Sequence, residues 1–89
     1  MREYRAITQK YGVELFDTFE EAETRVMCEG SGELITFFLR KNPLSYLGAI
    51  PETESKCIGM RVFEDDKWWG VDIHGSGRRF PIEMYEREF

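Results

Sequence analysis

Three side chains of the types that most often bind metal ions or attack substrates stand at Cys28, Cys57 and His74. Structural zinc takes four ligands, usually including a close pair such as Cys-x-x-Cys, and these three residues form no such pair. A thiolate–imidazole pair of Cys57 with His74 would be a nucleophile in principle. His74, however, directly precedes a glycine-rich turn, and Cys57 falls on an alternating strand, where cysteine usually fills space. We therefore expect no metal site and no catalytic residue, and the chain is not predicted to be an enzyme.

Carboxylates and glycine loops are the other groups that could do chemistry. Acids gather at residues 14–33, where seven stand against one base, and again at residues 64–66. Carboxylates on a helix surface or in a turn are usually solvated, and the second run lacks the ligand ladder of a calcium loop. The glycine segments 30–32 and 75–77 lack the lysine of a phosphate loop and the spaced glycines of a dinucleotide fold. We expect no cofactor.

The strongest candidate for a binding surface is a predicted hairpin that carries Trp68, Trp69, His74, Arg78 and Arg79. Adjacent strand residues point to opposite faces, so only one indole can face the core. The alternation predicts that Trp69 lies inside, and that Trp68 lies on the other face with His74. Tryptophan and arginine dominate binding hot spots, and both also stack on bases. The alternative is that the helix or a second layer covers Trp68 as well.

A second candidate surface is an acidic helix that carries Glu20, Glu21 and Glu23. The segment from Thr18 to Glu21 is a capping box, which places the start of the helix there, and Gly30 suits its end. These acids can simply form a solvated face. The sharper interpretation is a negative surface that docks on a basic groove of another protein.

The elements that must position these groups are mostly strands. Apolar patterns predict strands over 4–9, 13–16, 33–39, 45–50, 57–63 and 68–74, with 78–80 pairing back. The order is therefore β-β-α-β-β-β-β, and the tight turns favour antiparallel pairing. We expect an α+β fold in which one helix packs on a mainly antiparallel, strongly bent sheet or small barrel.

The length and composition indicate one domain over residues 1–89. No apolar run approaches the roughly 20 residues of a membrane span, and the first residues lack the apolar stretch of a signal peptide. Two cysteines are too few for the disulfide framework of a small secreted domain. We expect a cytoplasmic protein without membrane contact, and two reduced, mostly buried thiols.

The net charge of −5 argues against a general nucleic-acid ligand, because an acidic protein repels phosphate at long range. The leading hypothesis is a non-catalytic protein-binding module. It would be a small acidic regulator or inhibitor, of the size and charge of many phage antagonists, that docks on a larger nucleic-acid-handling protein. The alternative is a small-molecule or single-stranded nucleic-acid binding module that uses Trp68, Arg78 and Arg79. An exposed Trp68 would serve a homodimer interface equally well.

Overall fold

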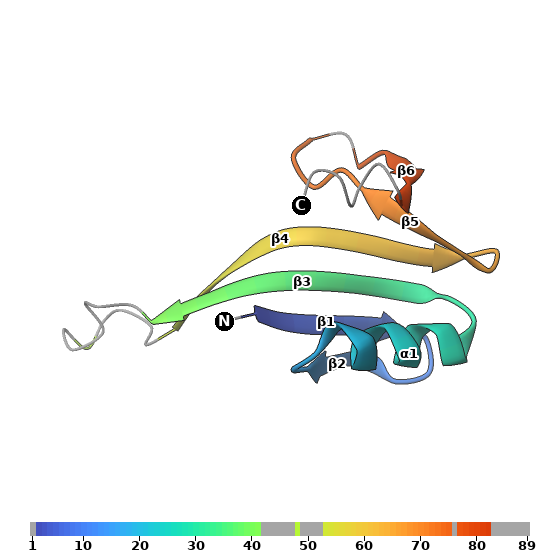
Figure 1. The fold of residues 1–89 in the computed structure, drawn as a ribbon. Helices are drawn as coiled ribbons and strands as arrows, with labels where there is room; N and C mark the ends of the chain where they lie inside the picture. The colour runs from blue at the N-terminus through green and yellow to red at the C-terminus, as the bar shows by residue number, and fades with distance from the viewer. Residues whose placement is uncertain (1, 42–47, 49–52, 76, 83–89) are drawn as a thin grey trace.

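The computed structural model describes residues 2–41, 48, 53–75 and 77–82. In this part of the chain the elements are β1 (Arg2–Thr8), β2 (Gly12–Phe16), α1 (Phe19–Glu29), β3 (Gly32–Lys41), β4 (Thr53–Glu64), β5 (Lys67–Val71) and β6 (Arg79–Pro81). The strands form one antiparallel sheet in the order β2-β1-β3-β4-β5-β6. Figure 1 shows α1 against one face of this sheet, at the end that holds β1 and β2.

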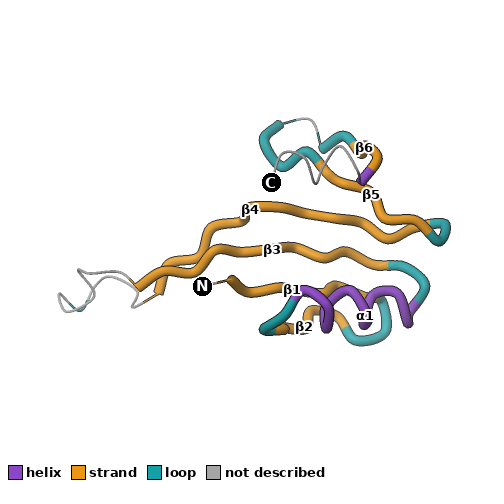
Figure 2. The backbone as a smooth tube through the Cα atoms, in the orientation of Figure 1, coloured by secondary structure: helices purple, strands orange, loops and turns teal. Residues whose placement is uncertain are grey.

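The expected α+β class with one helix on an antiparallel sheet is confirmed. The sheet is open rather than closed into a barrel, because among the described strands β2 and β6 each have one hydrogen-bonded neighbour and do not pair with one another. Figure 2 shows these two strands at opposite margins of the fold. The expected element order is confirmed in part: the strand predicted over 45–50 lies, apart from Gly48, outside the described residues, and the last described strand is β6. No helix among the described residues is long and apolar enough to cross a membrane.

Helix α1 forms where the capping box predicts it. The Thr18 hydroxyl accepts a hydrogen bond from the Glu21 backbone N–H at 3.3 Å, and Gly30 ends the helix in the left-handed conformation with φ of 83°. Ala22 and Val26, one turn apart, are fully buried on the face toward the sheet. The helix is therefore fixed by local signals at both ends and by apolar packing along one side.

The core lies between α1 and the centre of the sheet. Its buried members are Ala6, Ala22, Val26, Leu34 and Phe63, and Tyr4, Phe16, Phe19 and Trp68 pack against them partly buried. The helix sits close to the sheet because Gly32 begins β3 directly beneath it. A Cβ at Gly32 would lie 2.7 Å from the Ile7 carbonyl oxygen, closer than real Cβ contacts, so this position needs glycine.

A β-bulge interrupts the long pairing of β3 with β4. The register shifts between Thr36, which pairs with Gly59, and Phe37, which pairs with Cys57, so Ile58 is an extra residue. A bulge bends its strand and redirects side chains. Figure 1 shows β4 strongly bent in its first part, far from α1. The bulge brings Ile58 and Gly59 to the margin of a pocket described below.

The predicted turn at residues 64–67 is a two-residue connection between β4 and β5, with Asp65 and Asp66 at φ of 54° and 60°. The expectation for the two indoles is wrong. Trp68 pairs with Phe63 and faces the core, with ring centroids 5.1 Å apart, so Trp69 takes the opposite face. The alternation separates the two rings correctly, but it cannot say which face the helix covers, because both faces of β5 carry a tryptophan.

Candidate functional site

The outer edge of β2 is an unpaired strand edge with large apolar side chains. Val13 and Leu15 are each 61% exposed. They pair in register with Ile7 and Arg5 of β1, on the face of the sheet that α1 does not cover. Among the described residues no strand pairs with the other side of β2. This edge therefore offers free backbone hydrogen-bonding groups beside exposed apolar surface.

A groove of about 470 Å³ lies next to this edge, between α1 and β2. Its lining residues are Phe16, Glu20, Glu21, Thr24, Arg25 and Cys28. The Arg25 Nε lies 3.0 Å from Glu14 Oε1, and its guanidinium also stacks over the Tyr11 ring at 4.4 Å. Since Arg25 is paired with a carboxylate, Glu20 and Glu21 give the groove a net negative character.

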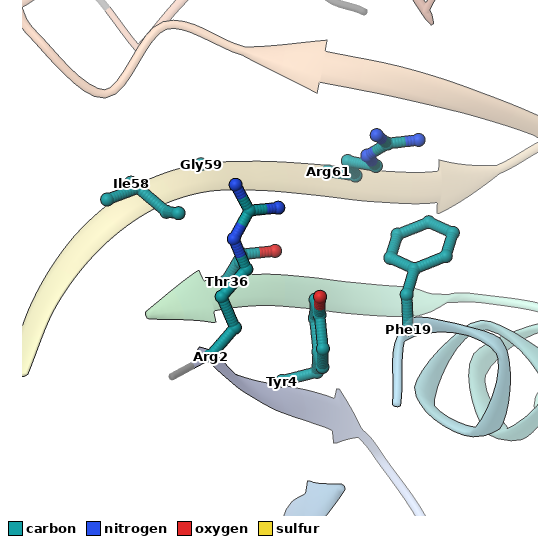
Figure 3. A pocket seen from close by; sticks show the side chains of 7 residues that line it. All are labelled: Arg2, Tyr4, Phe19, Thr36, Ile58, Gly59 and Arg61. Atoms are coloured by element: carbon teal, nitrogen blue, oxygen red, sulfur yellow. The ribbon is translucent and has the colours of Figure 1, made fainter. Parts of the chain in front are cut away.

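A second pocket, of about 210 Å³, lies on the helix-covered face at the start of β1 (Figure 3). It is lined by Arg2, Tyr4, Phe19, Thr36, Ile58, Gly59 and Arg61. The Tyr4 and Phe19 rings meet edge to face at 5.9 Å, and the Arg61 guanidinium carbon lies 4.7 Å from the centre of the Phe19 ring. The pocket therefore combines two guanidinium groups with two aromatic rings.

No family model matches the chain, and neither does any curated protein or solved structure. Its function is therefore argued from its own residues.

The residues expected to bind a partner do not form one surface. Glu20 and Glu21 line the β2 groove, whereas Glu23 is half-buried and not part of the lining. At the other end of the sheet, Trp68 packs on the core and Arg79 pairs with Glu64. The acidic helix thus contributes two of its three candidate residues to a groove, and the hairpin contributes none to either site described here.

The other hairpin residues lie in exposed positions. His74 is in the turn after β5, where its backbone N–H donates to Asp72 Oδ1 at 2.9 Å. Arg78 is also exposed, next to the start of β6. This arrangement gives the Trp68 indole and the two hairpin arginines no shared pocket among those described.

The cysteines take two different environments. Cys28 is exposed on α1, contrary to the expectation of mostly buried thiols, and Cys57 is half-buried beside the bulge. Neither forms a disulfide, and the Cys57 thiol lies 3.7 Å from the Gly59 carbonyl oxygen. Within the described part of the chain, no three histidine, cysteine or acidic residues are grouped so that they could hold a metal ion.

The pocket around Arg2 was missed by the sequence analysis. Its residues come from β1, β3, β4 and the start of α1, so only the pairing of distant strands brings them together. The one local signal was Arg2 and Tyr4, which stand two residues apart and therefore share a strand face. That signal is too common to single out a site.

Proposed function

We propose that this chain is a non-catalytic protein-binding module that accepts an extended segment of a basic partner protein along the free edge of β2. The observation that carries the proposal is the edge itself, with Val13 and Leu15 each 61% exposed beside unpaired backbone. Adding a strand to an open sheet edge is a recurrent mode of peptide recognition. Main-chain hydrogen bonds would supply affinity, and the flanking side chains would supply specificity.

The charge near the edge supports a basic partner over a second copy of the chain. Glu20 and Glu21 line the adjacent groove, and the charge of Arg25 is offset by Glu14. Two copies paired through β2 would bring both acidic grooves to one interface, where like charges repel. A segment with lysine or arginine would be attracted instead. A small acidic regulator that covers a basic site on a nucleic-acid-handling protein fits this chemistry.

The alternative suggested by the sequence, a nucleic-acid or small-molecule site on Trp68, Arg78 and Arg79, has weaker support. The Trp68 ring lies against Phe63 instead of standing free for stacking, and Arg79 is paired with a carboxylate. Trp68 therefore does not offer the free aromatic platform that base stacking needs.

Selection of random displayed peptides on the immobilised full chain tests the proposal. We expect the recovered peptides to alternate apolar and basic residues, because alternate side chains of an added strand face the same side. Binding should be lost in Val13→Lys and Leu15→Lys, since charge on an edge strand opposes pairing. Met27→Lys is the matched control: Met27 is 48% exposed but lies on α1, so this variant should bind like the parent.

Three results would contradict the proposal. Recovery of acidic peptides would show that the partner is not basic. If no peptide were enriched, the β2 edge would not be a peptide-binding edge. Equal loss in Met27→Lys would point to a general effect of added charge. Sedimentation of the chain without peptide tests whether a second copy of the chain occupies the edge instead. A dimer that Leu15→Lys abolishes would show that it does.

A further inference from the structure

We infer that the pocket between the start of β1 and the bulge of β4 binds a small aromatic anion, a phosphate or carboxylate carried on a single ring. This site uses Arg2, Tyr4, Phe19 and Arg61, none of which lines the β2 groove. The inference is therefore independent of the proposed docking edge. It rests on the charge, the rings and the volume of the pocket, taken in turn below.

The charge comes from two strands that are not neighbours. Arg2 reaches the pocket from β1 and Arg61 from β4, with β3 between them. No acidic side chain belongs to this lining among the described residues, although the whole chain carries a net charge of −5. A guanidinium binds carboxylate or phosphate through paired, charge-assisted hydrogen bonds. The lining thus offers guanidinium donors to an anion on a protein that is acidic as a whole.

The two rings lie beside the two arginines. Figure 3 shows Tyr4 between Arg2 and Phe19, with Arg61 above the Phe19 ring. The edge-to-face contact of Tyr4 with Phe19 and the stacking of Arg61 on Phe19 hold this row in place. The hydroxyl groups of Tyr4 and Thr36 add hydrogen-bonding capacity at the same pocket. A flat ligand ring would find aromatic surface within reach of an anion-binding group.

The volume of the pocket limits the size of the ligand that it can hold. Pockets for drug-sized ligands usually measure about 300–1,000 Å³. At about 210 Å³ this pocket is smaller, which suits one ring with one anionic substituent. A nucleic-acid strand would need a longer positive groove that follows several phosphates. The bulge helps to shape this space, because it directs Ile58 and Gly59 to the margin of the pocket.

Titration of the ¹⁵N-labelled full chain with phenyl phosphate, benzoate, phenol and inorganic phosphate tests the inference. We expect the two aromatic anions to shift the backbone amides of Thr36, Gly59 and Arg61. Phenol lacks the charge and inorganic phosphate lacks the ring, so each should bind about tenfold or more weakly. Equal binding of phenol would show that the arginines do not bind the ligand, and equal binding of inorganic phosphate would show that the rings do not.

Three variants locate the site. Arg2→Gln and Arg61→Gln should each weaken phenyl phosphate binding about tenfold, the usual effect of losing a charged hydrogen bond. Arg2 is exposed, so its replacement should leave the fold intact even if Arg61→Gln disturbs the packing on Phe19. Arg40→Gln is the control, because Arg40 lies on β3 outside the pocket and pairs with Glu54.

Each remaining outcome is decisive. Unchanged affinity in Arg2→Gln, shifts confined to other residues, or no shift at millimolar phenyl phosphate would overturn the inference. A short oligothymidylate that bound more tightly than phenyl phosphate would assign the pocket to single-stranded nucleic acid instead. Val13→Lys should leave phenyl phosphate binding unchanged, so failure here and failure of the docking edge are separate results.

Discussion

In the described part of the chain, the two edge strands of the sheet, β2 and β6, are built from different residues. β6 has three residues, Arg79–Pro81, and so combines a short strand with a charge and a proline that lacks a backbone N–H. These are the devices by which natural sheets avoid edge-to-edge pairing. β2 has five residues, exposes Val13 and Leu15, and contains one charged residue, Glu14, and no proline. The β6 edge is thus short and interrupted by a proline, whereas the β2 edge is longer and exposes two apolar side chains.

The β2 edge is also held in place by more of the core than the β6 edge. Helix α1 packs on β1, β2 and β3, and its residues Ala22 and Val26 are fully buried there. Toward β5 and β6, the core extends from Phe63 of β4 to Trp68 of β5, which packs on it partly buried. A strand held rigid before it meets a partner loses less conformational entropy on binding. The β2 edge therefore belongs to the part of the sheet that the helix holds in place.

Replacing Leu34 with alanine should have the largest effect on this comparison. Leu34 is fully buried on β3, in the same cluster as Ala22, Val26 and Phe63. Its truncation should lower the free energy of unfolding by about 3 kcal/mol, as buried Leu→Ala changes usually do. Urea denaturation measures this loss, and Met27→Ala is the exposed control.

Hydrogen exchange of the Leu34→Ala variant shows whether the two ends share one core. Because Phe63 belongs to the cluster around Leu34, amides of β5 should lose protection together with those of β1 and α1. If β5 kept its protection while β1 and α1 lost theirs, the ends would be separate units. The helix could then not be the support that distinguishes one edge from the other.

Substitutions in the two edge strands should have an intermediate effect, which is measured as self-association of the chain. Pro81→Val would give β6 a backbone donor and a β-branched side chain, whereas Leu15→Lys would add charge to β2. Each added strand hydrogen bond contributes about 1 kcal/mol. At equal concentration we expect Pro81→Val to associate more than the parent. Leu15→Lys should sediment like the parent, because the acidic grooves already oppose the pairing of two β2 edges. Sedimentation velocity gives this comparison, and a Pro81→Val chain that sediments like the parent would remove the distinction between an open and a protected edge.

The features that the sequence predicted correctly are local ones. The capping box at Thr18, the stop at Gly30 and the turn at residues 64–67 each depend on a few adjacent residues, and all three are present. The acids Glu20 and Glu21 were found in the same way, because the early turn of a helix can be recognised from its cap.

The features that the sequence could not give depend on register between distant strands. Arg2 and Arg61 meet at one pocket only because β3 pairs with both β1 and β4, and because Ile58 is inserted opposite Thr36 and Phe37. Which tryptophan faces the core is also a question of register, since Trp68 follows Phe63 across the hairpin. Alternation sets the period of a strand, but the covered face is set by where the helix packs.

The smallest effect on stability should come from Glu14→Gln, which removes the ion pair of Glu14 with Arg25. The two side chains are 28% and 35% exposed, so solvent screens the pair and the loss should stay below about 1 kcal/mol. The effect on binding should be clearer, because an unpaired Arg25 would place a positive charge in the groove of Glu20 and Glu21 and repel a basic segment. Glu54→Gln is the matched control, since it removes the same charge from the pair of Glu54 with Arg40 at the far end of β3 and β4. Calorimetric titration with a selected basic peptide should show weaker binding for Glu14→Gln than for Glu54→Gln. An equal loss in both would mean that only net charge attracts the partner, and the β2 edge would then have no electrostatic advantage over the rest of the molecule.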